Sequence, residues 1–111
     1  MKRKIAVASQ GTGGLEDTVS PIFGRCRVFT IVDVTEDGIG RVEVKKSPWA
    51  DVSHGAGPLT SQMIDKLSVN LVIAGNFGPT VSTLLGEAGI EKAVEPTGTK
   101  IGDAVRRHLR S

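Results

Sequence analysis

The sequence predicts an α/β fold in which helices cover a five-stranded mixed sheet. The N-terminal half has two apolar runs joined by Glu36-Asp37-Gly38, a combination typical of a β-hairpin. The C-terminal half alternates short apolar runs with stripes at helical spacing, which is typical of parallel strands connected by helices. At 111 residues we expect a single domain, residues 1–111, that can bury a substantial core.

Five segments have the pattern of β-strands. Lys4 to Ser9 is a nearly continuous apolar run, as expected for a central strand that is buried on both faces. Val42 and Val44 alternate with charged residues, so one face of their strand should meet water. The expected strands are residues 4–9, 27–34, 39–46, 69–74 and 90–94.

Three segments have apolar residues at helical spacing. Pro58 stands in the expected first turn of the first and Pro79 opens the second, and proline is favoured in the first turn of a helix. Thr97 or Thr99 should cap the third helix. The stripes are Leu59, Met63, Ile64 and Leu67; Val81, Leu84, Leu85 and Ala88, ending near Gly89; and Ile101, Ala104, Val105 and Leu109.

The resulting order, β-β-β-α-β-α-β-α, predicts which strands are neighbours. Strands joined by a hairpin are antiparallel, and strands connected through helices are parallel. We therefore expect strand order 3-2-1-4-5, with strand 2 antiparallel to its neighbours. Four loops should then meet at one edge of the sheet, where ligands of open α/β sheets bind. These loops are residues 11–14, 23–27, 49–57 and 75–79.

Two of these loops indicate an anion site. Residues 54–58 (HGAGP) and 75–79 (GNFGP) both place Gly-Pro at the expected start of a helix. The unpaired N–H groups of a helix N-terminus have a partial positive charge and bind anions. Arg25 and Arg27 should lie nearby. The alternative is that these glycines only allow tight turns. Tight turns are a good explanation for one such loop, but a poorer one for two such loops at the same edge of the sheet.

The one cysteine of the chain, Cys26, stands between Arg25 and Arg27. These arginines should favour the thiolate, which is the form that binds metal, and His54 is the other metal donor expected at this edge. In a regular strand, however, the arginines would point to the face opposite Cys26. A packed cysteine and a surface histidine are the alternatives. Two donors cannot enclose a structural zinc, but they could tether a preformed, anionic metal–sulfur cluster.

Composition excludes several classes of protein. A formal charge of +2 is too small to indicate nucleic-acid binding, and Arg106, Arg107 and Arg110 suit the negative end of a helix. No apolar run approaches the ~20 residues that span a bilayer, and residues 5–8 are too short a run for a signal peptide. One cysteine forms no internal disulfide. We therefore expect a cytoplasmic protein that binds neither nucleic acid nor a membrane. His108, beside the last apolar stripe, should be structural.

Five motifs in a fixed order connect the chain to a known family. They are KIAVAS; VSPIFGRC, followed by an apolar strand with Asp33; HGAG; VIAGNFGP; and EAGI, with a closing helix after TGT. Nearly end to end, the chain resembles the dinitrogenase iron–molybdenum cofactor biosynthesis family, small proteins similar to NifX and to the C-terminal part of NifB. The resemblance implies a ribonuclease-H-like fold and non-catalytic binding of a molybdenum- and iron-containing metal–sulfur cofactor or its precursor. It also implies a protein that donates or accepts the cofactor.

The resemblance associates a histidine and the FGR loop with cofactor binding. Relatives often have a histidine where this chain has Ile22, so one of the possible metal ligands is missing here. The cluster could therefore be held mainly by backbone N–H groups and arginines. Among the candidates, His54 and Cys26 are the expected metal ligands. The candidate cofactor site is Phe23, Gly24, Arg25, Cys26, His54, Gly55, Gly57, Gly75, Asn76 and Gly78.

Two kinds of enzyme are the main alternatives. A metal-dependent nuclease or hydrolase of the same fold needs several carboxylates on the sheet, but the first strand has none and Asp33 falls at the far end of the second. A cysteine-based enzyme would use Cys26 with His54 and Asp51. The favoured interpretation remains a carrier that is not an enzyme.

Two further features stay open. A nucleotide site would use Gly11 and Gly13, but Glu16 replaces the third glycine of the usual motif and no Gly-Lys-Ser/Thr follows. Trp49 forms a wall of its loop or packs on the sheet.

Overall fold

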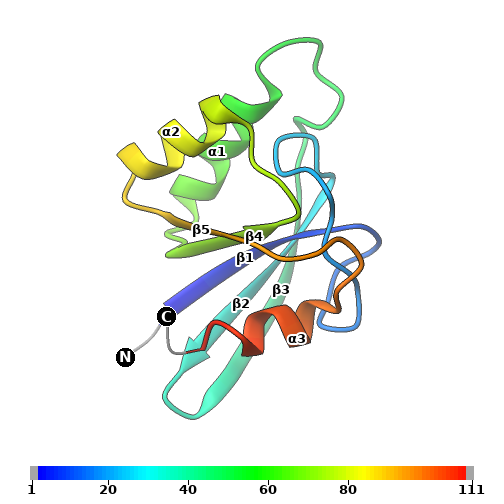
Figure 1. The fold of residues 1–111 in the computed structure, drawn as a ribbon, viewed down its shortest axis with the longest axis vertical. Helices are drawn as coiled ribbons and strands as arrows, with labels where there is room; N and C mark the ends of the chain where they lie inside the picture. Colours follow the sequence, from blue (N-terminus) through cyan, green and yellow to red (C-terminus); the bar gives the residue numbers. More distant parts are fainter. Residues whose placement is uncertain (1–2, 110–111) are drawn as a thin grey trace.

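The computed structural model describes residues 3–109, so Arg110 of the basic C-terminal cluster lies outside the described residues. The elements follow the predicted order (Figure 1). No helix within residues 3–109 has the length and apolar character needed to cross a membrane. The strands are β1 (Arg3–Ser9), β2 (Val28–Thr35), β3 (Gly38–Lys46), β4 (Leu71–Ala74) and β5 (Glu91–Val94). The helices are α1 (Ala56–Lys66), α2 (Pro79–Glu87) and α3 (Ile101–Arg106).

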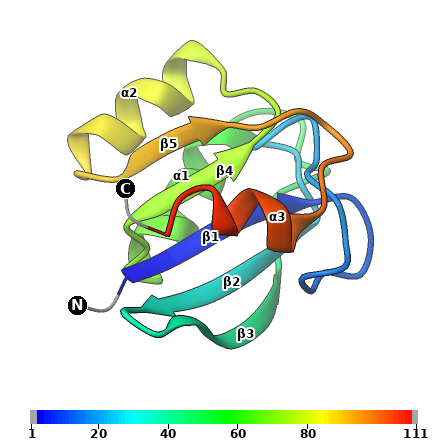
Figure 2. The same cartoon turned by 60° about the horizontal axis from the view of Figure 1, so that its bottom comes forward.

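The strands form one mixed sheet in the order β3-β2-β1-β4-β5, which confirms the predicted topology (Figure 2). β2 pairs antiparallel with both β1 and β3. β4 pairs parallel with β1 and with β5. The hairpin pattern and the helical crossovers in the sequence therefore specified the neighbours of every strand. β3 and β5 are the two edges of the sheet.

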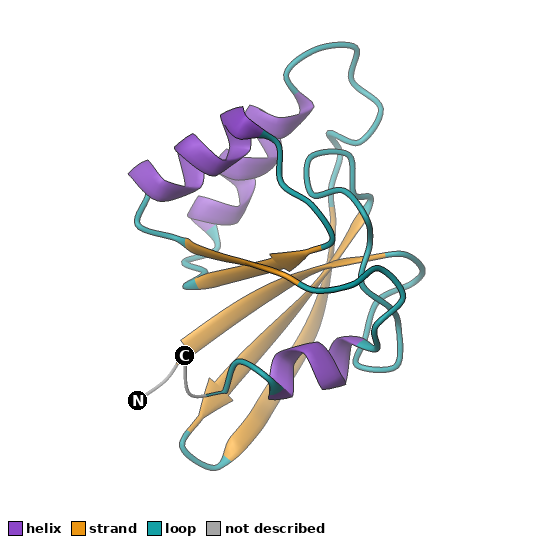
Figure 3. Ribbon diagram, in the orientation of Figure 1, coloured by secondary structure: helices purple, strands orange, loops and turns teal. Residues whose placement is uncertain are grey.

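Helices cover the two faces of the sheet unequally. α1 and α2 lie side by side on one face, and α3 lies alone on the other (Figure 3). The core under α1 and α2 includes Phe29 and Ile64, and the core under α3 includes Val7 and Ile101. The central strands β1 and β4 are therefore buried on both faces, which explains their continuous apolar runs.

Pro58 lies in the first turn of α1, as predicted, whereas the predicted cap of α3 is wrong. α1 begins at Ala56, two residues before Pro58, because Gly55 takes a left-handed conformation (φ 77°) and turns the chain into the helix. α3 has Lys100 at its N-cap, with no side-chain cap. Its first N–H groups instead donate to backbone carbonyls of a distant loop: Ile101 to Asp17 and Gly102 to Leu15, each at 2.9 Å.

A buried carboxylate ties the end of α3 to the segment after β5. Glu95 is 7% exposed; its Oε1 accepts a hydrogen bond from Arg107 Nη1 at 2.6 Å, and its Oε2 lies 2.9 Å from His108 Nε2. His108 is thus part of a structural cluster. Burial raises the pKa of Glu95, but the hydrogen bonds with His108 and Arg107 outweigh burial, and the pKa lies below its ordinary value.

We expect Glu95→Gln to remove an acid-sensitive part of the stability. Because the pKa of Glu95 is lower in the folded than in the unfolded state, its carboxylate stabilises the fold above the unfolded pKa. That contribution is lost as the pH falls through the folded pKa. The variant should lose about 1–3 kcal/mol of unfolding free energy at neutral pH, and less than this below about pH 3. Urea unfolding at both pH values measures the difference.

Glu87→Gln, an exposed residue of α2, is the control for this prediction, and it should change stability little at either pH. If Glu95→Gln were as harmless as Glu87→Gln at neutral pH, the cluster would not stabilise α3.

Candidate functional site

Two of the predicted loops are joined by backbone hydrogen bonds at the carboxyl end of β1 and β4. The N–H of Gly75 donates to the carbonyl of Ser20 at 2.8 Å, and the N–H of Phe23 donates to the carbonyl of Asn76 at 3.3 Å. The ring of Phe23 also lies 5.6 Å from that of Phe77, between centroids. The loop of residues 20–27 is therefore fixed against the loop of residues 75–78.

Arg25 joins a third loop, residues 47–55, to the same place. Its Nη1 donates to the carbonyl of Ala50 at 3.0 Å and to that of Val52 at 2.9 Å. Carbonyl oxygens orient a guanidinium but do not neutralise it, so Arg25 keeps its positive charge. We call the three loops, residues 20–27, 47–55 and 75–78, the rim; they confirm most of the convergence that the topology predicted.

Arg27 differs from Arg25 because a carboxylate pairs with it. Its two terminal nitrogens lie 2.6 and 2.8 Å from the carboxylate oxygens of Asp51, in an exposed bidentate pair. The positive charge that the sequence led us to expect from two arginines is therefore supplied by Arg25, with Arg27 largely compensated.

In the fourth predicted loop, residues 11–14, the glycine N–H groups are already hydrogen-bonded within the protein. The N–H groups of Gly11 and Gly13 donate to the Asp17 carboxylate at 2.9 and 2.8 Å, and that of Gly14 donates to Thr30 Oγ1 at 3.0 Å. The carboxylate of Asp17 therefore occupies the position at which a phosphate would bind to this loop. The loop does reach the same edge of the sheet, since Gly11 and Arg25 line one cavity, but the nucleotide alternative loses its phosphate loop.

The predicted glycines fall into two groups. A Cβ on Gly24 would lie 3.1 Å from Gly57 Cα, and one on Gly57 would lie 2.8 Å from Val81 Cγ2, so these glycines allow loops and helices to pack closely. In the second group, a Cβ would have no atom within 4 Å. The close-packed group is Gly24, Gly57 and Gly75, and the open group is Gly55 and Gly78. Only the open group leaves room for a ligand at its own Cα.

The open glycines stand at the N-termini of α1 and α2, which begin at the rim (Figure 1). Neither N-cap makes a side-chain hydrogen bond, and neither helix has an acidic residue in its first turn. The first N–H groups of a helix have no partner within it, and here no side-chain cap or carboxylate competes for them. Both helices are therefore suited to bind an anion at this end.

Cys26, within the rim loop of residues 20–27, is a protonated, buried thiol. It is 3% exposed, and its Sγ donates to the carbonyl of Val28 at 2.9 Å and approaches that of Ser9 at 3.4 Å. Burial raises its pKa. The expectation that the flanking arginines favour the thiolate is wrong, because burial of the sulfur is the largest influence on its pKa and outweighs the hydrogen bonds that would lower it. A cysteine-based enzyme would also need a lowered pKa.

A cavity of about 320 Å³ adjoins Cys26. Residues from both ends of the β1–β2 connection line it, including Gln10, Arg25 and Arg27. Cys26 could reach a ligand here only by giving up its backbone hydrogen bonds.

His54 is exposed, two residues before α1, whereas Phe23 is fully buried. Phe23 therefore positions the rim from inside the core, and the exposed side chains of Arg25, His54 and Asn76 are the ones that a ligand can meet. Residues 3–109 contain no group of three or more His, Cys, Asp or Glu side chains able to hold a metal ion. Within those residues, the hydrolase alternative lacks the carboxylate cluster that it requires.

Comparison with known proteins assigns the family. The family model described as "Dinitrogenase iron-molybdenum cofactor" matches residues 1–111. The chain belongs to this family. The model spans the whole chain, so it includes the rim and all of the candidate residues.

Individual relatives of the iron–molybdenum cofactor family agree with the assignment. The apo form of the orange protein from Desulfovibrio gigas is 31% identical, with a TM-score of 0.86 over 96% of this chain and 87% of that one. A Thermotoga protein named as a candidate NifB protein of the DUF35 family is 33% identical, with a TM-score of 0.75 over 96% and 86% of the chains. An uncharacterized protein from Methanocaldococcus jannaschii is 29% identical over 91 residues, covering 82% of this chain and 76% of that protein.

Sequence reasoning missed several residues that build the rim of this family member. Thr60 Oγ1 donates to the carbonyl of Gly24 at 3.0 Å and so anchors the FGR loop to α1. Asp51 compensates Arg27. The backbone of residues 50–52 accepts from Arg25. None of these contacts has a sequence signal, because the partners are separated by 24 to 36 residues with no fixed spacing.

Proposed function

We propose that the protein binds an anionic metal–sulfur cofactor that contains molybdenum and iron, or a precursor of it, at the rim. It would then pass the cofactor to another protein and would not act as an enzyme. The observation that supports this most is that the loop carrying Arg25 packs against the start of α1, where His54 lies two residues before the helix, while neither α1 nor α2 has a side-chain cap at its N-terminus. Family membership supports the chemical class of the cargo.

The donors of the rim suit a large anion that arrives with its coordination nearly complete. Backbone N–H groups and a guanidinium bind the sulfide surface of a cluster by charge-assisted hydrogen bonds. His54 adds one nitrogen that can coordinate a metal. Few protein ligands mean that few metal–protein bonds must break when the cargo leaves, which is what a carrier requires.

Cys26 has a secondary place in this proposal. To coordinate a metal its thiol would have to lose its proton, against a raised pKa, and give up the hydrogen bond to Val28. Hydrogen-bonded capture with His54 as the protein ligand avoids this step. Cys26 as a metal ligand remains a prediction, and Cys26→Ser separates the two possibilities.

Anaerobic reconstitution with iron, sulfide and tetrathiomolybdate tests the proposal. We expect a visible absorption that stays with the protein through gel filtration. Arg25→Gln should weaken retention about ten- to a hundredfold, since one charge-assisted hydrogen bond contributes about 1.5–3 kcal/mol. Arg27→Gln is the matched control and should have a smaller effect because Asp51 already compensates Arg27. Cys26→Ser should retain the cluster if capture is by hydrogen bonds. Absence of any retained absorption would contradict the proposal.

A further inference from the structure

A second concave surface lies between the end of β3 and one side of α1. It encloses about 530 Å³ and shares no lining residue with the cavity beside Cys26. α1 contributes Leu59, Gln62, Met63 and Lys66, whose spacing places them on one face of the helix. The end of β3 and the chain after it contribute Lys45, Lys46 and Trp49. We call this surface the lysine groove.

The apolar part of the lysine groove consists of side chains that the core covers only partly. Leu59, Met63 and Trp49 are each half-buried. Trp49 therefore forms a wall of this groove, which answers the question that its sequence position left open. Tryptophan supplies a large, rigid apolar surface, and methionine adapts its shape to what it meets.

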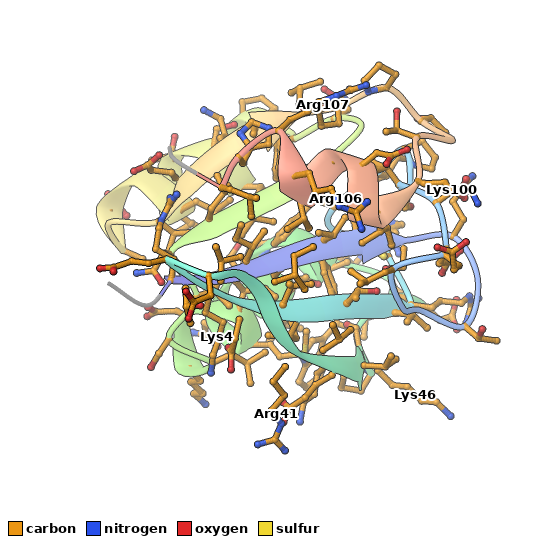
Figure 4. The ribbon with its side chains drawn as sticks, turned by 90° about the horizontal axis from the view of Figure 1, so that it is seen from below. Lys4, Arg41, Lys46, Lys100, Arg106 and Arg107 are labelled. Carbon is orange, nitrogen blue, oxygen red and sulfur yellow. The ribbon has the colours of Figure 1, made fainter. Side chains whose placement is uncertain are left out.

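The charged part of the groove consists of lysines that have no partners within residues 3–109. The ammonium groups of Lys45, Lys46 and Lys66 form no ion pair or hydrogen bond with any residue in 3–109, and no carboxylate lines the groove. Figure 4 shows Lys46 extending away from the end of β3. Within the described residues, Lys4 and Lys92 likewise lack an ion pair, whereas several other basic side chains pair with carboxylates: Arg27–Asp51, Arg41–Glu43, Lys100–Glu16, Arg106–Asp103 and Arg107–Glu95.

We propose that the lysine groove binds an acidic peptide segment of a partner protein. An apolar side chain of the segment would pack against Trp49 and Met63, and its carboxylates would face the three lysines. Apolar anchors in a central pocket supply most of the affinity of such interfaces, and complementary charge at the border supplies specificity and speed of association. This inference goes beyond the proposed function and does not depend on it.

The distribution of the lysines favours a peptide over other anionic ligands. Lys45 and Lys46 stand on the strand and Lys66 on the helix, so positive charge lies on both sides of the apolar surface. A peptide places several carboxylates along its length, whereas a fatty acid has a single one. β3 is also an edge of the sheet, where an extended peptide can add main-chain hydrogen bonds.

Trp49 provides the readout for a test, because it is the one tryptophan and the chain has no tyrosine. The probe is a short synthetic peptide with a central phenylalanine flanked by glutamates. We expect a saturable change in Trp49 emission that weakens as salt is added. Replacing phenylalanine by glycine, or the glutamates by lysines, should abolish it. The proposal would be overturned if the glycine peptide, an oligonucleotide or decanoate changed Trp49 emission as much as the glutamate–phenylalanine peptide does. It would also be overturned if the glutamate–phenylalanine peptide caused no change.

Two charge-reversal variants locate the binding. Lys66→Glu should weaken peptide affinity about tenfold, since it turns an attraction into a repulsion. Lys92→Glu makes the same change at an exposed residue of β5 and should leave affinity unchanged. Equal effects of the two variants would overturn the proposal. Lys66→Glu should retain the metal–sulfur cluster as well as the unsubstituted protein does. The experiment therefore distinguishes a failure of the peptide-binding proposal from a failure of the proposal that the rim binds the cofactor.

Discussion

Phe23→Ala is expected to lower the free energy of unfolding by about 3–5 kcal/mol. Phe23 is fully buried, and its ring centroid lies 5.4 Å from that of Phe29 and 5.6 Å from that of Phe77. Its removal leaves a cavity where the loop of residues 20–27 enters the core under α1 and α2. Because this loop also holds the other two loops of the rim, cluster retention should fall as well.

Equilibrium unfolding in urea measures this loss, and Ile22→Ala is its control. Ile22 is the neighbouring residue and is 54% exposed, so its truncation should change stability by no more than about 0.5 kcal/mol. Similar losses in the two variants would mean that Phe23 does not anchor the rim.

Gly75→Ala should also be strongly destabilising, by about 1–3 kcal/mol, through overpacking. A Cβ at this position would lie 2.7 Å from Thr97 Oγ1, 2.9 Å from Pro21 Cα and 3.1 Å from the Pro21 carbonyl oxygen. The two Pro21 atoms belong to the backbone, so the steric overlap with the added methyl group can be relieved only if the two loops move apart. That separation would also break the hydrogen bond from Gly75 to Ser20.

Gly78→Ala makes the same chemical change three residues later, in the same loop. A Cβ there would have no atom within 4 Å, and the backbone φ of −69° suits alanine. Thermal and urea unfolding should therefore find Gly78→Ala close to the unsubstituted protein. If both variants lost the same stability, the close contact of Gly75 with Pro21 would not be the cause.

The fold was predictable because it depends on local patterns. Asp37-Gly38 between alternating strands specified the hairpin, and the change to helical spacing after Pro58 specified the parallel half. The ends of elements were less predictable. α3 is not capped by a threonine because Leu15 and Asp17, far away in sequence, accept its first N–H groups. Such tertiary partners have no local signal.

The candidate site was predictable in its place and less so in its chemistry. Topology alone brings residues 20–27, 47–55 and 75–78 to one edge. Strand alternation does not apply to Cys26 and its flanking arginines, because β2 begins only at Val28 and all three side chains line one cavity. The protonation state of Cys26 depends on burial, and the charge of Arg27 depends on its distant pairing with Asp51. The self-contained loop around Asp17 was missed for the same reason.

Amide chemical shifts, recorded as the reconstituted cluster is added to isotope-labelled protein without air, test the central claim most directly. We predict that the affected amides concentrate at the rim and at the first turns of α1 and α2, above all at Arg25, His54, Gly55, Asn76 and Gly78. Unchanged shifts at these residues, or changes centred on residues 11–17 or on α3, would contradict the claim that the rim holds the cargo.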